Sequence, residues 1–246
     1  MEIYYLFNSG FLIEIGDDAL IIDYYRGDLG KPWKAPLERQ PSGYRDVYVF
    51  ASHVHGDHYN RAIFNWLSER DDIKYILSDD IKPSVPAALI KKGGKHSIDF
   101  LADGGRLSIG RLDIRAYGST DEGISFHIVA EDGTSIFHAG DLNYWHWRDE
   151  STEAEIAEAF TMFINELDKI KKGVEKIDYA FFPVDPRMGS DYYRGAAIFC
   201  ETMKPARLIP MHSTAALDPP KDFFDAVAAY TKVIRVGAKS GKLNVY

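Results

Sequence analysis

The chain has 246 residues, of which 46% are hydrophobic and 27% charged, so it has enough apolar material for a buried core. Its formal net charge of -8 argues against the broad phosphate-binding surface of a nucleic-acid protein. The single cysteine excludes intramolecular disulfides and cysteine-rich zinc sites, and it fits a reducing compartment.

The amino-terminal segment predicts short strands joined by tight turns. Three apolar runs, "IYYLF", "FLIEI" and "ALIIDYY", are separated by "NSG" and "GDD". Glu2 stands where a signal peptide would carry positive charge, and no apolar run approaches the length of a membrane span. We therefore expect a cytoplasmic protein that does not enter a membrane.

The next segment places a histidine cluster at the end of a strand. A polar loop from about Arg26 to Arg45 precedes the β-rich run "DVYVF", and "SHVHGDH" follows that run directly. Beyond it, "YNRAIFNWLSER" has helical apolar spacing and "KYILS" reads as another strand. The cluster is therefore expected on a loop at a strand's carboxyl end.

The rest of the chain predicts hairpins and then alternating helices and strands. "GRLSIGRLDIRAYG" and "ISFHIVAEDGTSIFHAGD" indicate antiparallel strands, a capped helix should run to Gly173, and strands and helices alternate afterwards. These elements predict an α/β fold, a four-layer αββα sandwich of two mixed sheets. No linker is evident, so residues 1–246 should form a single domain with two pseudo-halves that meet near residues 116–123.

The cluster brings metal-binding side chains together. His53 and His55 point to the same side of an extended segment, and the loop should return Asp57 and His58 toward them. Imidazole and carboxylate groups are the ligands of zinc, manganese or iron in hydrolytic sites. A solvated loop with chance histidines is the alternative.

One such segment cannot supply two metal shells, so further ligands are expected at other strand ends. "FHAGD" places Asp141 after a strand and a Gly turn, and "IPMHS" places His212 directly after another strand. The shared local architecture makes a common rim plausible.

With these residues the sequence resembles the metallo-β-lactamase fold hydrolases, most of all their lactonase-like, small-substrate branch. The family pattern is a strand-end Asp, an HxHxDH segment, a later His, an Asp after Gly and a last His. The matching positions, spread over nearly the whole chain, are Asp23, His53, His55, Asp57, His58, Asp141 and His212.

The resemblance implies a role for each of these residues. His53 and His55 would hold a first metal ion, Asp57, His58 and His212 a second, and Asp141 would bridge the two. Asp23 would orient the cluster loop from outside the ligand shell. Zn²⁺ is the implied cofactor, as one or two ions, with Mn²⁺ or Fe as alternatives.

The sequence departs from the family pattern at the middle histidine. The corresponding stretch is "YGSTDEGISF", which places Ser119 where that histidine would fall. Asp121, Glu122 or His127 could supply the missing ligand, although His127 is expected to be a satisfied histidine within a sheet. If none does, the first site is weakened and one metal ion binds.

Several other polar residues are candidates near the rim. His146 in "DLNYWHW" could donate a proton to the leaving group, with Asp57 as the other catalytic candidate, or it could pack under the loop. Asn143 and Arg187 could contact substrate, Arg187 through bidentate hydrogen bonds to a carboxylate or phosphate. His138 is expected to be buried and hydrogen-bonded.

Together these features predict a metal-dependent hydrolase. It would cleave an ester, lactone, amide or phosphoester bond of a small polar substrate through a metal-activated hydroxide. The alternative is a metal-binding or ligand-sensing scaffold with reduced catalysis and one occupied site. A nuclease is disfavoured because the chain is acidic and shows no basic recognition arm, so nucleic acid is not expected as a partner.

Overall fold

The computed structural model describes residues 1–25, 43–90, 95–213, 219–236 and 241–243. The chain divides into two compact units. Unit 1 comprises Met1–Ala102 with Lys239–Tyr246, and unit 2 comprises Asp103–Ala238. Most of the polar loop from about Arg26 to Arg45 lies outside the described residues.

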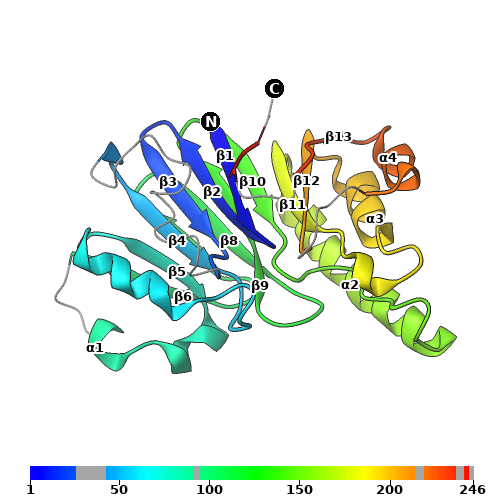
Figure 1. Cartoon of the computed structure of the whole chain (residues 1–246), viewed down its shortest axis with the longest axis horizontal. Helices are drawn as coiled ribbons and strands as arrows, with labels where there is room; N and C mark the ends of the chain where they lie inside the picture. The colour runs from blue at the N-terminus through cyan, green and yellow to red at the C-terminus, as the bar shows by residue number, and fades with distance from the viewer. Residues whose placement is uncertain (26–42, 91–94, 214–218, 237–240, 244–246) are drawn as a thin grey trace. The chain divides into compact units, whose positions relative to one another are not determined.

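Seven strands within the described part of unit 1 form one mixed sheet (Figure 1). The three pairings from β14 to β3 are antiparallel and the three from β3 to β6 are parallel. In sheet order the strands are β14 (Gly241–Lys242), β1 (Glu2–Phe7), β2 (Gly10–Ile15), β3 (Asp18–Ile22), β4 (Val47–Ala51), β5 (Lys74–Ser78) and β6 (Ser97–Leu101).

Short helices follow the parallel strands of unit 1. They are the 3-10 helices η3 (Arg61–Ser68) and η4 (Asp79–Ser84) and the single turn α1 (Ala87–Ile90). Asn60 begins η3, because its side-chain oxygen accepts a hydrogen bond from the Ala62 N–H at 2.9 Å. Trp66 on η3 lies edge-on to Tyr24, with ring centroids 5.0 Å apart, in the core of this unit.

Seven strands within the described part of unit 2 form the second mixed sheet. The pairings from β7 to β10 are antiparallel and those from β10 to β13 are parallel. In sheet order the strands are β13 (Lys232–Val233), β12 (Arg207–Met211), β11 (Tyr179–Pro183), β10 (Ser135–His138), β9 (Ile124–Ala130), β8 (Leu112–Gly118) and β7 (Arg106–Ile109).

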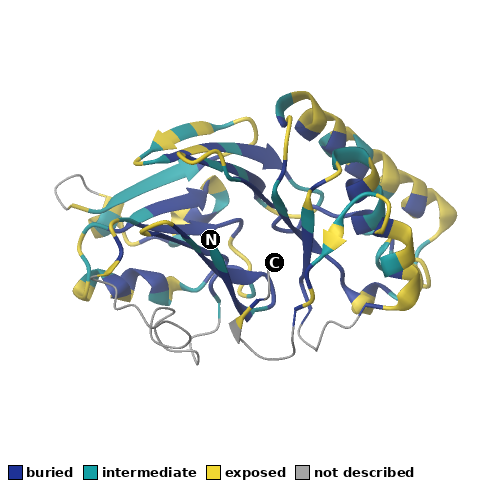
Figure 2. Ribbon diagram, turned by 90° about the horizontal axis from the view of Figure 1, so that it is seen from above, coloured by how far each residue is buried: buried dark blue, intermediate teal, exposed yellow. Residues whose placement is uncertain are grey.

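The helices of unit 2 are α2 (Glu153–Gly173), η5 (Pro186–Met188), α3 (Arg194–Met203) and α4 (Lys221–Val227). A capping box between Thr152 and Glu155 begins α2, as expected from its sequence. Its buried face carries Ile156, Phe163, Leu167 and Ile170, and Figure 2 shows the opposite side exposed. Cys200 on α3 is fully buried, which raises the pKa of its thiol and leaves it unreactive.

The expected α/β class with two mixed sheets is confirmed, and each predicted apolar run forms a strand or helix. Residues 116–123 lie at the end of β8 and in the turn to β9, within unit 2, and the single-domain organisation stays a prediction. Among the described residues, no helix combines the length and the apolar character that crossing a membrane requires.

Candidate metal centre

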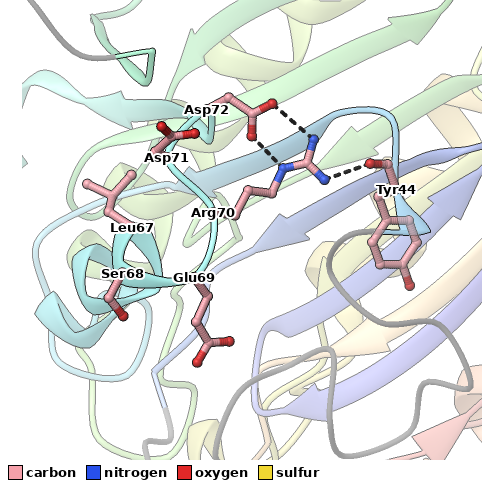
Figure 3. Close-up of a pocket in the computed structure, with 7 residues that line it drawn as sticks. All are labelled: Tyr44, Leu67, Ser68, Glu69, Arg70, Asp71 and Asp72. Atoms are coloured by element: carbon pink, nitrogen blue, oxygen red, sulfur yellow. Dashed lines mark hydrogen bonds and ion pairs between the residues drawn. The ribbon is translucent and has the colours of Figure 1, made fainter.

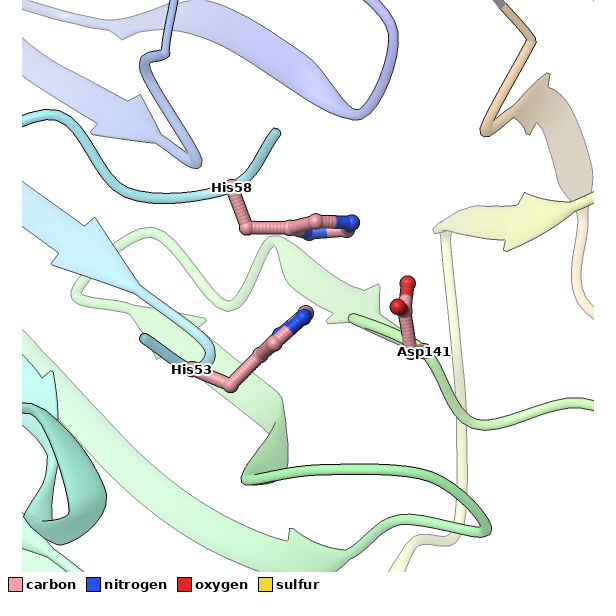
Figure 4. Close-up of side chains that lie close together, drawn as sticks. All are labelled: His53, His58 and Asp141. Carbon is pink, nitrogen blue, oxygen red and sulfur yellow. The ribbon is translucent and has the colours of Figure 1, made fainter. Parts of the chain in front are cut away.

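The cluster loop of unit 1 (Ser52–His58) begins where β4 ends. His53 and His58 are fully buried, and their ring centroids lie 4.2 Å apart. Figure 4 shows the two imidazoles extending side by side from this loop. His55 is exposed with its ring 4.7 Å from that of His53, and the Asp57 carboxylate is 41% exposed and 3.8 Å from His58 Nε2. The loop therefore gathers all four predicted groups.

Asp23, directly after β3, is hydrogen-bonded to this loop. Its carboxylate accepts hydrogen bonds from the Ser52 N–H, the Ser52 hydroxyl and His58 Nδ1, each at 2.8 Å. Asp23 adopts a left-handed backbone conformation with φ of 49°, which aspartate tolerates better than most residues. A fully buried carboxylate thus holds the two ends of the cluster loop.

These contacts define which ring nitrogens carry protons. A carboxylate only accepts, so His58 Nδ1 must be the donor to Asp23. The Ser52 hydroxyl gives its proton to Asp23 and therefore accepts one from His53 Nδ1 at 3.0 Å. In the neutral form of the imidazole, both histidines then present the Nε2 lone pair, which is the form that binds a metal ion.

Two further contacts fix the cluster loop, and both involve residues that the sequence analysis did not select. The Asp80 carboxylate accepts a hydrogen bond from the Val54 N–H at 2.9 Å, and the Asn8 side-chain amide lies 3.4 Å from the Asp57 carboxylate. Asp80 lies on η4 and Asn8 in the β1–β2 turn, so nothing in their local sequence connected them with the cluster.

In unit 2 the predicted ligands Asp141 and His212 lie together. Asp141 extends from the loop after β10 (Figure 4), where Gly140 supplies a φ of 55°, and His212 directly follows β12 with a φ of 63°. The two side chains are almost fully buried, and His212 Nε2 is 3.3 Å from Asp141 Oδ1. Trp145 braces the pair by donating its indole N–H to the Asp141 carbonyl at 2.8 Å.

Asp185 is the main residue of this site that the sequence analysis missed. It follows β11, is fully buried, and accepts a hydrogen bond from His212 Nδ1 at 3.0 Å. Burial alone would raise the pKa of Asp185, but hydrogen bonds from His212 and Arg187 outweigh burial and lower the pKa to about 2. Its position after the apolar run "DYAFFPV", a strand end like those before Asp141 and His212, was the available signal.

The geometry of unit 2 fits a metal ion. With its proton on Nδ1, His212 directs a lone pair at an Asp141 oxygen 3.3 Å away, and two facing lone pairs need a proton or a cation between them. A tetrahedral site with ligand bonds of about 2.0–2.2 Å separates adjacent ligand atoms by about 3.3–3.5 Å. The observed separation matches that requirement.

The structure favours one of the residues that could replace the missing histidine. Asp121 can place a carboxylate oxygen within 4.8 Å of one from Asp141. His127 instead lies within β9, where its Nε2 is 2.9 Å from the Ser135 hydroxyl, and burial lowers its pKa to about 4. The expectation of a satisfied sheet histidine is confirmed for His127. Ser119 accepts a hydrogen bond from the Asp121 N–H at 3.2 Å.

The other candidate residues of unit 2 are engaged with the protein itself. His146 is buried, with Nδ1 2.9 Å from the Tyr144 carbonyl and Nε2 3.3 Å from the Ser190 carbonyl, so it packs under its loop. His138 is buried and its Nδ1 accepts the Gly140 N–H at 3.2 Å, as expected. A proton-donor role for His146 stays a prediction.

Asn143 and Arg187 also make internal contacts. Asn143 is fully buried and exchanges backbone hydrogen bonds with the Thr120 hydroxyl, one of them 3.0 Å long. The Arg187 guanidinium binds both oxygens of Asp185, with Nη2 2.6 Å from Oδ2. Substrate contacts by either residue stay predictions.

Each unit also has a surface hollow. In unit 2 a hollow beside the Asp141 loop is lined by Thr120, Asn143, Trp145, Glu155, Glu158, Ala159 and Met162. The hollow of unit 1, drawn in Figure 3, is lined by Tyr44 and residues 67–72. Its Arg70 guanidinium donates to Asp72 and to the Tyr44 carbonyl, so the positive charge of Arg70 is compensated within the protein.

Comparison with known proteins gives a match in structure but not in sequence. No family model matches the chain, and no curated protein is significantly similar to it. The metallo hydrolase Igni18 of the hyperthermophilic archaeon Ignicoccus hospitalis is 18% identical with a TM-score of 0.63, and the alignment covers 100% of this chain and 99% of that one.

Two further solved structures are similar. The metallo-β-lactamase fold protein YhfI of Bacillus subtilis is 13% identical with a TM-score of 0.62, over 96% of this chain and 92% of that one. The diiron β-hydroxylase CmlA of Streptomyces venezuelae is 12% identical with a TM-score of 0.59, over 99% of this chain and 54% of that one. The chain therefore has the metallo-β-lactamase fold, as the resemblance implied.

Proposed function

We propose that this protein is a metal-dependent hydrolase that cleaves an ester, lactone, amide or phosphoester bond of a small polar substrate. The observation that carries the proposal is the His212–Asp141 pair, because its 3.3 Å separation and fixed tautomer suit a bound cation. The cluster loop supports it independently, since Asp23 prepares His53 and His58 in the same way. The hydrolase-named neighbour of the same fold adds support.

We further propose that the two sets of groups serve one metal centre, a step that rests on the sequence resemblance. His53 and His55 would hold a first ion, Asp57, His58 and His212 a second, and Asp141 would bridge them. Asp121 would complete the first shell in place of the missing histidine, since its carboxylate can approach that of Asp141. A site richer in oxygen ligands suits manganese or iron as well as zinc.

A bound metal ion would lower the pKa of a water molecule and polarise the substrate oxygen. The residues of the chain do the rest of the work. Asp23 and Asp185 hold the imidazole protons on Nδ1, so that the ligand nitrogens stay deprotonated. Asp57, half-exposed beside His58, can accept a proton from attacking water.

Elemental analysis of the purified protein, together with a Ser119→His variant, tests this function first. About two ions per chain in the wild type would support the proposal, with Asp121 as the replacement ligand. Loss of metal in His58→Ala and Asp141→Ala, with parallel loss of activity on a panel of lactones, esters and phosphoesters, is expected. Unchanged metal content and activity in both variants would refute the ligand assignment.

A metal-binding or ligand-sensing scaffold is the second candidate, favoured by Ser119 at the place of a ligand histidine. It predicts about one ion per wild-type chain, rising to about two in Ser119→His. It also predicts no turnover on the substrate panel. Iron as the native metal is a further outcome that the elemental analysis would reveal, and the diiron neighbour CmlA shares the fold.

A further inference from the structure

Asp185 makes an unusual set of contacts for a residue in a turn after a strand. Asp185 is fully buried. The turn that follows it places the Arg187 side chain, which is 61% exposed, in contact with the Asp185 carboxylate. A buried carboxylate is costly unless it is paired and hydrogen-bonded, so its retention at this place requires a physical reason.

Both carboxylate oxygens of Asp185 bind Arg187, and Oδ2 also binds His212. Oδ1 accepts from the Arg187 backbone N–H at 2.9 Å and from Arg187 Nε at 3.0 Å. Oδ2 accepts from Arg187 Nη2 at 2.6 Å and from His212 Nδ1 at 3.0 Å. Arg187 thus fixes the plane of the carboxylate and compensates its charge, while Oδ2 stays directed at His212.

A purely structural role for Asp185 is poorly supported, because its neighbourhood is already joined by backbone pairing. β11 and β12 are paired in parallel up to Pro183 and Met211, and the Val184 N–H then donates to the Met211 carbonyl at 3.0 Å. The turn is therefore held next to β12 without the Asp185 side chain. The Asp185 side chain caps η5 by accepting the Arg187 N–H, and in addition it fixes the proton on His212 Nδ1.

We propose that Asp185 is a positioning residue that sets the tautomer and ring orientation of His212, with Arg187 as its counter-charge. The inference rests on the proposed function, in which His212 is a metal ligand. Asp185 keeps the proton on Nδ1, and the Nε2 lone pair faces Asp141. Arg187 serves this pair, and its contact with a substrate anion stays a separate prediction.

The first test uses metal-free protein at pH 8, where an ordinary imidazole is neutral. Long-range ¹H–¹⁵N spectra of ¹⁵N-histidine-labelled protein report which ring nitrogen of His212 carries the proton, with the signals assigned through His212→Gln. The wild type should show the Nδ1–H form. Asp185→Ala should shift the ring mainly to the Nε2–H form, and Asp185→Asn, whose amide oxygen can still accept, should keep Nδ1–H.

Asp178→Asn is the matched control, because Asp178 precedes β11 just as Asp185 follows it. Its carboxylate accepts the Ser135 N–H at 3.0 Å and pairs with Lys176, without contacting His212. The Asp178→Asn spectrum of His212 should equal that of the wild type. An unchanged Nδ1–H form in folded Asp185→Ala would overturn the proposal.

The second test measures Zn²⁺ affinity by competition with a chromophoric chelator. Asp185→Ala should weaken binding by about 10–100-fold, the usual effect of removing a group that supports a ligand, and Asp178→Asn by less than about threefold. Equal losses in both variants would mean that stability alone controls the affinity, against the proposal. If the wild-type protein bound no zinc, the proposed function would be contradicted. The spectra of the metal-free protein would still decide the role of Asp185.

Discussion

The two units each tie a histidine to a buried carboxylate, but they compensate its charge differently. In unit 1, Asp23 is enclosed and accepts from the Ser52 N–H, the Ser52 hydroxyl and His58. In unit 2, Asp185 meets the guanidinium of Arg187, whose side chain is 61% exposed. The first pair is part of the buried framework, whereas the second remains open to water on its Arg187 side.

The backbone shows a related difference. In the Asp23–His58 pair of unit 1, the aspartate has a left-handed backbone conformation, with φ of 49°. In the Asp185–His212 pair of unit 2, the histidine has it, with φ of 63°. Such conformations cost free energy in residues other than glycine and persist where the surroundings determine them. The strain therefore falls on the anchor in unit 1 and on the candidate ligand itself in unit 2.

The strongest test of this comparison is removal of each carboxylate in turn. Asp23→Ala leaves buried donors of Ser52 and His58 without their acceptor, so we expect a loss of about 3–5 kcal/mol in the free energy of unfolding. Asp185→Ala should lose about 1–3 kcal/mol, because it leaves only the buried His212 Nδ1 without its acceptor, while water can solvate the exposed Arg187 guanidinium. Urea unfolding of both variants measures the difference, and the reverse order would break the comparison.

His127 extends the comparison to pH, because among the described residues its ring bonds to the Ser135 hydroxyl and not to a carboxylate. Burial lowers the pKa of His127 to about 4, below the value of about 6.5 in an unfolded chain, so the unfolded state binds the proton more readily. Its contribution to stability is complete above about pH 6.5 and is lost as the pH falls toward 4, by about 3 kcal/mol.

Urea unfolding between pH 7 and pH 4 in wild type and His127→Gln isolates this contribution. The variant should lose less stability over that interval than the wild type. His96→Gln is the control, since that histidine is only partly buried and bonds through Nε2 to the Leu89 carbonyl. Identical pH dependence in wild type and His127→Gln would contradict the assignment.

Ser52 and Ser78 are both buried at strand ends, but only the Ser52 hydroxyl contacts residues of the candidate site. Ser52→Ala removes a donor to Asp23 and an acceptor for His53, and it should cost about 1–2 kcal/mol. The buried hydroxyl of Ser78, at the end of β5, has no hydrogen-bond partner among the described residues, so Ser78→Ala should be neutral or slightly stabilising. Thermal unfolding of both variants measures the two changes in stability. Similar losses of stability in the two variants would contradict the role given to Ser52.

The smallest expected effect is that of Arg187→Ala. Because the guanidinium is mostly exposed, water can replace it, and the loss of stability should be about 0.5 kcal/mol. Chemical denaturation in low and high salt provides the measurement. A loss comparable to that of Asp23→Ala would show that the two carboxylates are enclosed alike, and the comparison would fail.

Much of this arrangement was accessible from the sequence because strand ends are marked by local pattern. The apolar runs before His53, Asp141 and His212 predicted strands, and the following turn residues predicted side chains at their carboxyl ends. The cluster residues and the β9 position of His127 were predicted in this way, whereas the role of Asp23 came from the family resemblance.

The remaining contacts depend on which strands become neighbours, and local pattern does not specify that. Asp185 precedes Arg187 in a Pro-containing turn that resembled an exposed loop, and only the parallel pairing of β11 with β12 brings it to His212. Asp80 likewise reaches the cluster loop because β5 pairs with β4. These are long-range pairings, set by the sheet as a whole.

The aligned ends of β10, β11 and β12 also govern which changes of chain length this protein can absorb. Ala139 and Val184, the first residues after β10 and β11, donate backbone hydrogen bonds to the neighbouring strand. Deleting one residue within β11 would turn Asp185 to the opposite face, because side chains alternate along a strand. Insertions in loops away from these strand ends do not change that alternation. Related chains should therefore differ in length mainly in those loops, and the lengths of these three strands should stay the same.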